Sequence, residues 1–588
     1  MADTKREIER KYEGPASESG AGGLPDLSGV PGVAAVVDKG LAELDATYYD
    51  TPDQRLAAAS VTLRRRTGGA DAGWHLKLPV SEGVRDEIRA PLSDTVPRAL
   101  SGLVRSRVRE AELVPLVRLV SARDVRHLVD ASGALLAEVS LDRVRAERLD
   151  GGAGEGGGGD GGGRSAGATA AWTEIEVELA DDGDPAFLDK VEKKLRKAGL
   201  RRSAAPSKLA KALAETGERA YEGAGARAGK GTGARAGKGT GVRAGKGTGV
   251  PAGKGAGERA GKRARKPASA AEPTFAAESA SAAEPASAAE PARKPAAELR
   301  TAGDHVLAYL RTQRDALVEL DPAVRRDLPD SVHSMRVATR RMRSAFGSYA
   351  RLLDPAVTGP IGDELKWLAG ELGVDRDREV LTDRLTHALG ELPRPLVTGP
   401  VRTRLRTWAH ARHGGSRRRL LAVLDGKRYL ALLTALDALV TEPPLLKGAA
   451  GDPGKVIAKA VRKDFARVGE LVAEAIDGQP GTDRDLAMHE ARKKAKRTRY
   501  AAEAATPALG APAASLAKAM KSLQGLLGDH QDSVMTREAL RELAALAHAA
   551  GESAFTYGVL YGREERRAAE AEAALPEAWR ATAAQASV

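Results

Sequence analysis

A run of residues with almost no large apolar side chains, 222–298, divides this chain into two parts that must build separate hydrophobic cores. Its first half repeats the octapeptide ARAGKGTG with small variations, and its second half is rich in Ala, Glu and Pro. Segments of this composition bury too little apolar surface to offset the entropy lost on ordering. We therefore predict a multidomain protein, with a disordered linker over 222–298 between folded domains at 1–215 and 299–580.

The same linker holds most of the excess positive charge. Residues 223–267 contain twelve Lys or Arg and a single acid, Glu258, in a chain whose formal net charge is +12. Such a stretch could attract a polyanion or nucleic acid by counterion release, or it could be a solvated spacer. Its GKGT pieces lack the G-x-x-x-x-G-K-[ST] spacing of a phosphate-binding loop, so we do not interpret them as a nucleotide site.

The sequence lacks two features, cysteine and long apolar runs, and this limits the kinds of site and location that we expect. The sequence has no Cys, which excludes disulfides, thiolate metal sites and cysteine nucleophiles. Its first residues are charged, and no apolar run approaches the roughly 20 residues of a membrane span. We therefore expect a cytoplasmic protein without a membrane partner.

The first folded region alternates apolar and polar residues in short runs bounded by turn residues, which predicts a β-rich α+β domain. The clearest runs are ATYYDT (46–51), VTLRRRTG (61–68), WHLKLPV (74–80), LLAEVSLDRV (135–144) and WTEIEVELA (172–180). The glycine tract at 151–167 lies between the last two and is expected to be a hairpin insertion.

Several of these strands carry charges on a face that would normally be apolar. Glu7, Glu9 and Lys11 have two-residue spacing, so they share one face of an extended segment, and Glu174 and Glu176 repeat the pattern. An antiparallel β-barrel or tunnel would turn these charges inward while the opposite faces pack against helices. The solvent-exposed face of an ordinary sheet is the alternative.

Four short motifs occur here in a fixed order: E-x-E-x-K at Glu7 to Lys11, L-R-x-R at Leu63 to Arg66, E-x-E at Glu174 and Glu176, and SKL around Lys208. Together they resemble the CYTH superfamily, or triphosphate tunnel metalloenzymes, over residues 1–215. That family includes thiamine triphosphatases, class IV adenylyl cyclases and inorganic triphosphatases. The resemblance therefore implies a divalent-metal-dependent triphosphatase. Cyclase activity is the less favoured reaction, because no adenine pocket is evident.

The resemblance also assigns roles to residues. A catalytic set of Glu7, Glu9 and Lys11 is implied. Mg²⁺ or Mn²⁺ would be held by the acids Glu7, Glu9, Glu87, Asp142, Glu174 and Glu176. The triphosphate would be bound by Lys11, Arg64, Arg66, Lys77, Arg123 and Lys208. Arg118 and Arg126 compete with Arg123 for its place in the alignment.

In the second folded region the period changes to 3.6 residues, which predicts an all-α helical bundle. The region is also duplicated. HSMRVATRRMRSAF from His333 corresponds to HEARKKAKRTRYAAE from His489, and KWLAGELG from Lys366 corresponds to KSLQGLLG from Lys521. We predict two repeats, at about 299–445 and 455–580.

The motif that begins at His333 and its counterpart at His489 each place several cations on one face of a helix. These cations repel one another unless an anion binds to them. These motifs resemble the CHAD domain, the conserved histidine α-helical domain, and the resemblance implies binding of inorganic polyphosphate. The residues concerned are His333, Arg336, Arg340, Arg341, Arg343, Lys366, His489, Arg492, Lys493, Lys496, Arg499 and Lys521. Nucleic acid is the alternative ligand, but no aromatic platform is interleaved with the stripes, and Phe346 and Tyr500 are expected in the core.

The combined hypothesis is a metal-dependent triphosphate hydrolase, similar to inorganic triphosphatases, that is tethered to a polyphosphate-binding helical domain. Such tethering would raise the local concentration of a bound chain near the tunnel. The alternative is a polyphosphate-binding or targeting protein whose tunnel does not turn over.

Overall fold

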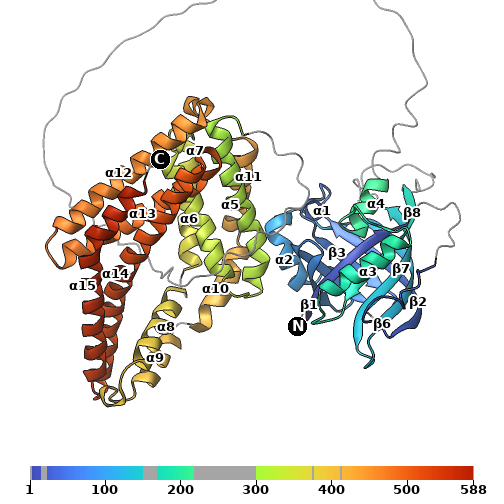
Figure 1. The fold of residues 1–588 in the computed structure, drawn as a ribbon, viewed down its shortest axis with the longest axis horizontal. Helices are drawn as coiled ribbons and strands as arrows, with labels where there is room; N and C mark the ends of the chain where they lie inside the picture. Colours follow the sequence, from blue (N-terminus) through green and yellow to red (C-terminus); the bar gives the residue numbers. More distant parts are fainter. Residues whose placement is uncertain are drawn as a thin grey trace, which may run out of the picture. The chain divides into compact units, whose positions relative to one another are not determined.

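The computed structural model describes residues 3–14, 23–69, 71–149, 168–216, 299–373, 376–410 and 413–586. The predicted linker at 222–298 and the glycine tract at 151–167 lie outside the described residues. Within them, the first region is built mainly of strands and the second of helices (Figure 1).

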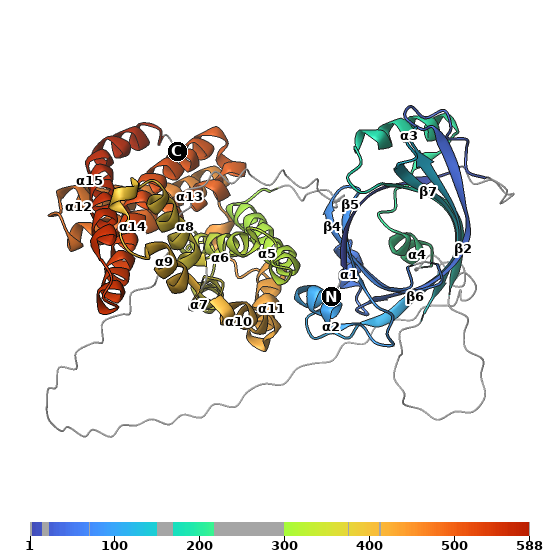
Figure 2. The same cartoon turned by 90° about the horizontal axis from the view of Figure 1, so that it is seen from below.

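Among the described residues, eight antiparallel strands close into a barrel, in the order β5-β4-β3-β2-β6-β7-β8-β1 with β1 pairing back onto β5. The strands are β1 Asp3–Glu13, β2 Ala35–Asp50, β3 Thr62–Thr67, β4 Gly73–Ser81, β5 Val84–Ala90, β6 Val114–Val129, β7 Leu135–Arg148 and β8 Thr169–Leu179. A two-residue strand, β9 Arg201–Arg202, adds to the end of β1. Figure 2 shows the closed ring. The predicted antiparallel barrel is therefore confirmed.

The apolar residues of the strands pack on the outside of this ring. Helix α3 (Ala186–Lys197) covers a cluster that includes Tyr12 and Val177. Helix α2 (Arg98–Val108) covers another that includes Trp74, and the short α1 (Arg55–Ala58) lies beside it. Because side chains alternate along a strand, covering the outer face with helices leaves the charged positions pointing inward.

One helix lies within the ring instead of on its surface. Figure 2 shows α4 (Lys208–Thr216) inside the circle of strands. Its Leu209 and Ala212 are buried against an apolar cluster from β2, β6 and β7, including Ala46, Leu119 and Val144. The helix thus fills the apolar part of the barrel and carries Lys208, its first residue, at the charged part.

The second region is helical throughout, as predicted. Its helices are α5 Ala302–Arg325, α6 Ser331–Ser348, α7 Pro355–Glu371, α8 Arg376–Gly390, α9 Val401–His410, α10 His413–Asp425, α11 Lys427–Thr441, α12 Pro453–Asp477, α13 Thr482–Leu509, α14 Ala511–Ala549 and α15 Phe555–Ala584, with short 3₁₀ turns η2 Arg394–Leu396 and η3 Lys447–Ala450. None of the described helices is long and apolar enough to cross a membrane.

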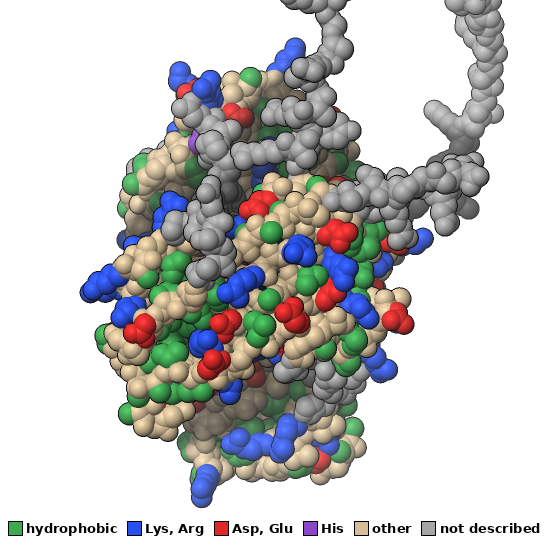
Figure 3. Space-filling view, turned by 90° about the vertical axis from the view of Figure 1, so that its right-hand side faces the viewer, with side chains coloured by type: hydrophobic (Ala, Val, Ile, Leu, Met, Phe, Trp, Pro, Cys, Tyr) green, Lys and Arg blue, Asp and Glu red, His purple; other side chains and the backbone are tan. Residues whose placement is uncertain are grey.

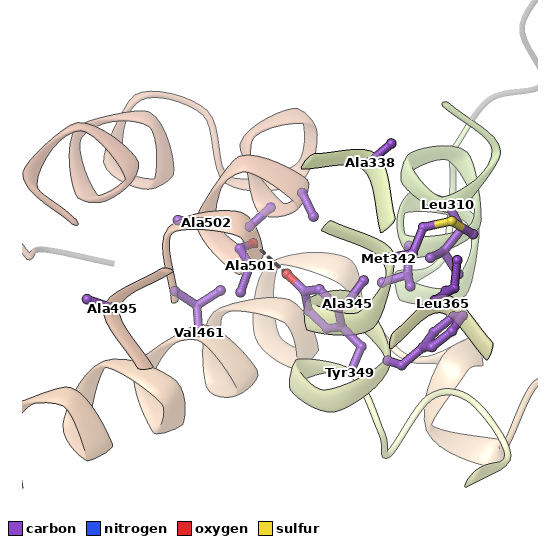
Figure 4. Packing of buried hydrophobic residues seen from close by; sticks show 14 of the residues in the cluster. Leu310, Ala338, Met342, Ala345, Tyr349, Leu365, Val461, Ala495, Ala501 and Ala502 are labelled. Carbon is purple, nitrogen blue, oxygen red and sulfur yellow. Dashed lines mark hydrogen bonds between the residues drawn. The ribbon is translucent and has the colours of Figure 1, made fainter. Parts of the chain in front are cut away.

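The duplicated motifs fall on corresponding elements of this region. The two His-x-x-Arg stripes lie on α6 and α13, and the two K-x-L-x-G motifs lie at the end of α7 and within α14. One hydrophobic core includes residues of both halves, such as Met342 and Ala502 (Figure 4). The hydroxyl of Tyr349, at the end of α6, donates a 2.7 Å hydrogen bond to the carbonyl of Ala501 on α13. Motif-bearing helices of the two halves are therefore packed together.

One face of the molecule carries charges of both signs among its described residues (Figure 3). On the face seen in Figure 3, the described acidic and basic side chains are interspersed instead of forming one large patch of a single sign. Interspersed charges give a weak net field outside the protein. The informative charges lie inside the barrel and along α6 and α13.

Candidate active site

The barrel holds a cavity of about 260 Å³ that is lined mainly by charged side chains. Nine basic and eight acidic side chains line it, and Tyr48 is the one aromatic residue among the lining residues. The predicted residues that line it are Glu7, Glu9, Lys11, Arg64, Arg66, Lys77, Glu87, Arg123, Glu176 and Lys208. Asp142 and Glu174 are also buried, and they contact this wall through Lys208. The structure thus brings the predicted metal and triphosphate residues into one space.

Cross-strand register explains how residues distant in sequence meet. Lys11 on β1 lies opposite Glu176 on β8, and Asp142 on β7 lies between Arg123 on β6 and Glu174 on β8. Residues directly opposite on neighbouring strands have Cβ atoms about 5 Å apart. A shift of one residue in any of these pairings would turn the charges to the apolar outer face.

One group of contacts forms where β1, β4 and β5 meet. Lys77 contacts the carboxylate of Glu7, and its Nζ lies 3.7 Å from Oε1 of Glu87. Nη2 of Arg64 lies at the same distance from Glu87. Burial raises the pKa of Glu7 to about 7, although Lys77 acts in the opposite direction. The Glu7 carboxyl group is therefore partly protonated near neutral pH.

Glu9 differs from Glu7 in its neighbours: Glu87 and Glu178 raise the pKa of Glu7, whereas cations dominate around Glu9. Nζ of Lys11 lies 3.3 Å from Glu9, and Nε of Arg85 lies 3.9 Å away. Burial alone would raise the pKa of Glu9, but Lys11 and Lys77 lower it to about 2. Two carboxylates of one strand are thus given different protonation states by their surroundings.

A second group of contacts forms where β6, β7 and β8 meet α4. Asp142, Glu174 and Glu176 offer carboxylate oxygens that all lie within 4.8 Å of one another. Nζ of Lys208 contacts the three acids at 2.9, 2.7 and 2.6 Å respectively. Carboxylate oxygens are the ligands that Mg²⁺ and Mn²⁺ favour, so this cluster could hold a metal ion.

The structure separates Arg123 from its two competitors. Arg123 pairs with Asp142 and Glu176 in the barrel interior. Arg118 is 47% exposed and pairs with Asp45, and Arg126 pairs with Asp38 and Asp124. Only Arg123 of the three lines the cavity. Of the three arginines, Arg123 is therefore the one whose position agrees with the predicted place in the tunnel.

The two arginines of the L-R-x-R motif both point into the cavity. The hydroxyl of Tyr48 is 3.3 Å from Nη1 of Arg64, and Arg66 contacts Asp71. Burial, with Arg64 and Arg123 nearby, lowers the pKa of Arg66 to about 9, which still leaves it cationic at neutral pH. Two adjacent guanidinium groups in one wall provide planar donors for a polyanion.

Sequence analysis missed several residues of this cavity. Lys5, Tyr48, Arg85 and Arg89 also line it. Lys5 continues the alternation of Glu7 and Glu9, so the period-two pattern could have indicated it, as it did Glu178, which shares the charged face of Glu174 and Glu176. His75, two residues before Lys77 on β4, does not line the cavity, but it is buried and its Nδ1 lies 3.0 Å from Glu87.

In the helical region, the predicted cations lie on α6, α7, α13 and α14. Arg336 and Arg492 are buried, with 7% and 4% of their surface exposed. Nη2 of Arg492 lies 4.0 Å from Asp532 on α14. Lys366 and Lys521 are exposed. His333, Arg340, Arg343, Lys493 and Lys496 are half-buried on the same helices as the buried arginines.

A glutamate links the stripes of the two halves. Glu503 accepts a hydrogen bond from Nε of Arg341 at 3.1 Å and one from Nε of Arg499 at 2.9 Å. Both guanidinium groups also lie over the ring of Tyr500, which is fully buried, as is most of Phe346. The first and second stripes therefore meet around Glu503.

The glycines of the downstream motifs make room for the buried arginines. A Cβ atom on Gly373 would lie 2.8 Å from Nη2 of Arg336, and one on Gly528 would lie 3.5 Å from Nη2 of Arg492. Gly373 and Gly528 hold corresponding positions in the two repeats. In each half, the His-x-x-Arg motif thus packs against the last glycine of the downstream segment, KWLAGELG or KSLQGLLG.

Comparison with known families agrees with both parts of this description. Residues 5–213 match the CYTH domain and residues 308–541 match the CHAD domain. The chain is a CYTH–CHAD protein. Two Mycobacterium tuberculosis proteins, "Uncharacterized protein MT2285" (strain CDC 1551 / Oshkosh) and "Uncharacterized protein Rv2226" (strain ATCC 25618 / H37Rv), are each 35% identical to it over 580 residues. The match covers 97% of the CYTH–CHAD chain and 95% of either relative.

Solved structures resemble single domains of this CYTH–CHAD protein. PptA from Streptomyces chartreusis is 22% identical, with a TM-score of 0.40 over 48% of this chain and 99% of its own. The CHAD domain from the plant Ricinus communis is 26% identical, with a TM-score of 0.38 over 48% of this chain and 94% of its own. HpAC1 from Hippeastrum, reported to have a dominant triphosphatase activity, is 20% identical, with a TM-score of 0.22 over 36% of this chain and 98% of its own.

Proposed function

We propose that this CYTH–CHAD protein is a divalent-metal-dependent triphosphatase and that its helical domain binds inorganic polyphosphate. One observation carries the first part: a closed barrel holds cationic side chains and a cluster of carboxylates around the same cavity. A triphosphate needs cations along its oxygens, and a divalent ion needs oxygen ligands. The cations and Glu176 line the cavity, and Asp142 and Glu174 contact Lys208 in its wall.

The cavity favours an inorganic triphosphate over a nucleotide. Its described lining contains one aromatic side chain, Tyr48, whose hydroxyl is directed to Arg64. A nucleobase would bury a flat apolar surface, and aromatic faces are the usual platforms for it. The lining residues are mainly charged, so they offer a phosphate chain many contacts and a base few. Tripolyphosphate is therefore the substrate that we propose.

In this proposal the side chains of the cavity have complementary roles. Asp142, Glu174 and Glu176 would hold the metal, with Glu7 and Glu9 on the neighbouring strand β1. When bound, the metal would polarise phosphoryl oxygens and neutralise developing charge. Lys11 and Lys77, which lie beside these acids, would hold the phosphate chain in line for attack by water. Positioning of this kind accounts for most of the catalysis of phosphoryl transfer.

The second part of the proposal rests on the cations of α6 and α13. Arg336 and Arg492 are buried in the protein, and Arg341 and Arg499 meet at Glu503. Cations fixed by packing lose little conformational entropy when an anion binds. A long polyanion could contact both repeats at once and gain affinity from each.

The test of the first part is phosphate release by the purified full chain from tripolyphosphate and from ATP, with Mg²⁺ and with Mn²⁺. A Glu7→Ala/Glu9→Ala double variant is measured beside it. We expect metal-dependent release that prefers tripolyphosphate and is lost in the double variant. Polyphosphate binding is measured in the same preparations, and we expect it to persist in the double variant.

Absence of turnover in the wild-type chain, with polyphosphate binding intact, would refute the triphosphatase. It would leave a polyphosphate-binding protein. Equal release from ATP and tripolyphosphate would instead refute the proposed substrate preference while keeping the hydrolase.

A further inference from the structure

The ammonium group of Lys208 occupies the centre of the acidic cluster. It lies 2.9 Å from Oδ2 of Asp142, 2.7 Å from Oε1 of Glu174 and 2.6 Å from Oε1 of Glu176. These contacts are buried, since Asp142 is 0% exposed, Glu174 3% and Lys208 8%. A point cation that touches three carboxylates at once fills the position that a metal ion held by the same three oxygens would need.

Lys208 is the first residue of α4, and the rest of that helix fixes where its stem begins. Leu209 and Ala212 are buried against β2, β6 and β7, so the backbone at 208 is held by packing. Oε2 of Glu174 accepts a hydrogen bond from Nε1 of Trp172 at 2.7 Å, which orients the carboxylate so that Oε1 faces Lys208. The fold therefore positions both partners of this contact, the ammonium of Lys208 and the carboxylate of Glu174.

The contact between Lys208 and the three carboxylates matters because it balances the charge of the cluster. Asp142, Glu174 and Glu176 carry three negative charges, and Lys208, Arg123 and Lys11 contact them with three positive ones. A divalent ion added to this set would leave an excess of two positive charges in a buried site. Uncompensated buried charge is costly.

We propose that Lys208 is a built-in competitor of the divalent cation at the Asp142–Glu174–Glu176 cluster, and that it leaves the cluster for a phosphate oxygen when metal and triphosphate bind together. This inference rests on the proposed function for the identity of the anion. It adds that one lysine couples metal binding to substrate binding. Metal alone binds weakly, because it must displace an ammonium from three carboxylates with no phosphate oxygen present to receive it.

The test measures Mn²⁺ binding to the full chain without any phosphate compound, by the loss of the free Mn²⁺ electron paramagnetic resonance signal. We expect Lys208→Met to bind Mn²⁺ about tenfold or more tightly than the wild type, since it removes a like charge at contact distance. The matched control is Lys211→Met. Lys211 lies one turn along α4 but pairs with Glu13 at 2.9 Å, away from the cluster, so its loss should leave Mn²⁺ affinity unchanged.

A second variant ties the gain to the cluster. Glu176→Gln added to Lys208→Met should remove the extra affinity. Equal Mn²⁺ affinity in the wild type and Lys208→Met, or weaker binding in Lys208→Met, would overturn the proposal. So would an equal gain in Lys211→Met, which would indicate a general effect of lowering the net charge.

A measurement on the wild-type chain covers the case in which Lys208→Met does not fold. Acetylation of individual lysines is followed by mass spectrometry, without ligand and with saturating Mn²⁺. Displacement from the cluster should make Lys208 more reactive, while Lys211 stays unchanged. Unchanged reactivity of Lys208 with Mn²⁺ bound would overturn the proposal. These readouts do not require turnover, so failure of the triphosphatase assay is a separate result.

Discussion

The guanidinium of Arg123 makes two parallel hydrogen bonds with the carboxylate of Asp142, 2.8 Å from Nε to Oδ1 and 2.7 Å from Nη2 to Oδ2. The pairing fixes the plane of the guanidinium, and Nη2 also reaches Oε2 of Glu176 at 2.8 Å. A lysine could satisfy the charge of Asp142 but not this geometry.

Arg123→Lys should therefore weaken binding of a triphosphate by about tenfold, because a lysine would present its charge without the fixed planar donors. Isothermal titration with the non-hydrolysable imidotriphosphate measures the effect. Arg118→Lys is the matched control, since Arg118 makes a similar forked contact with Asp45 on the outside of the barrel. Equal losses in both variants would contradict the assignment of Arg123 to the cavity.

The pH dependence of polyphosphate binding should depend on His489. Burial lowers the pKa of this histidine below 6.5, with Lys493 and Arg492 acting in the same direction and Gln531 and Glu490 opposing. The imidazole is thus neutral at pH 7 and gains its charge only as the pH falls below 6.5. Polyphosphate binding should strengthen on acidification, and His489→Gln should reduce that gain, as measured by titration at pH 7.5 and 5.5.

Through the same histidine, a fall in pH should lower the free energy of unfolding, although it strengthens polyphosphate binding. The unfolded chain takes up the proton at a higher pH than the folded chain, so the contribution of His489 to stability is lost as the pH falls from 6.5. Without polyphosphate, His489→Gln should make the free energy of unfolding less sensitive to acid. A steeper loss in the variant than in the wild type would contradict the lowered pKa.

The two corresponding glycines of the helical region should respond differently to alanine. Gly373→Ala places a Cβ 2.8 Å from Arg336 and must displace the guanidinium, whereas Gly528→Ala makes an ordinary 3.5 Å contact with Arg492. We expect Gly373→Ala to weaken polyphosphate binding several-fold. Gly528→Ala, within α14, should keep binding and gain up to about 1 kcal/mol of stability from helix propensity. Similar binding in both variants would contradict the packing described.

The hydrogen bond between Tyr349 and Ala501 should stabilise the junction of the repeats. Tyr349→Phe leaves the buried carbonyl of Ala501 without this donor, which should lower the free energy of unfolding by about 1–2 kcal/mol. Denaturant unfolding of the full chain measures it. Tyr561→Phe serves as the control, because Tyr561 contacts the exposed Arg541 instead, and a loss as large there would argue against a special role for Tyr349.

Much of the barrel could be predicted because its two strand faces differ so strongly. The alternation around Glu7 and Glu176 indicated a charged interior, and the structure places both in the cavity. The contacts could not be predicted, because they depend on register between distant strands. That Lys11 faces Glu176 follows from pairing across 165 residues, and that Lys208 reaches Asp142 follows from the placement of α4.

The helical region shows the same limit. The two stripes were visible as a repeat, since helical spacing and the offset between His333 and His489 are local and periodic properties. The bridging role of Glu503 was not, because it depends on how α6 and α13 cross. The repetition of Gly373 and Gly528 was also visible in the sequence. The reason for these glycines was not, because it depends on where Arg336 and Arg492 lie in the structure.

The pairing of β1 with both β8 and β5 has a consequence for synthesis on the ribosome. β1 precedes the other barrel strands in the chain and closes the barrel by pairing with β8, which ends at Leu179. Glu7 and Glu9 therefore reach their final surroundings only after most of the domain has been translated. Until then, β1 has an open edge bearing two acids and a lysine on the face that later lines the cavity. Charges on an unpaired edge discourage pairing with other chains. The residues proposed for catalysis would thus also protect the nascent chain from aggregation.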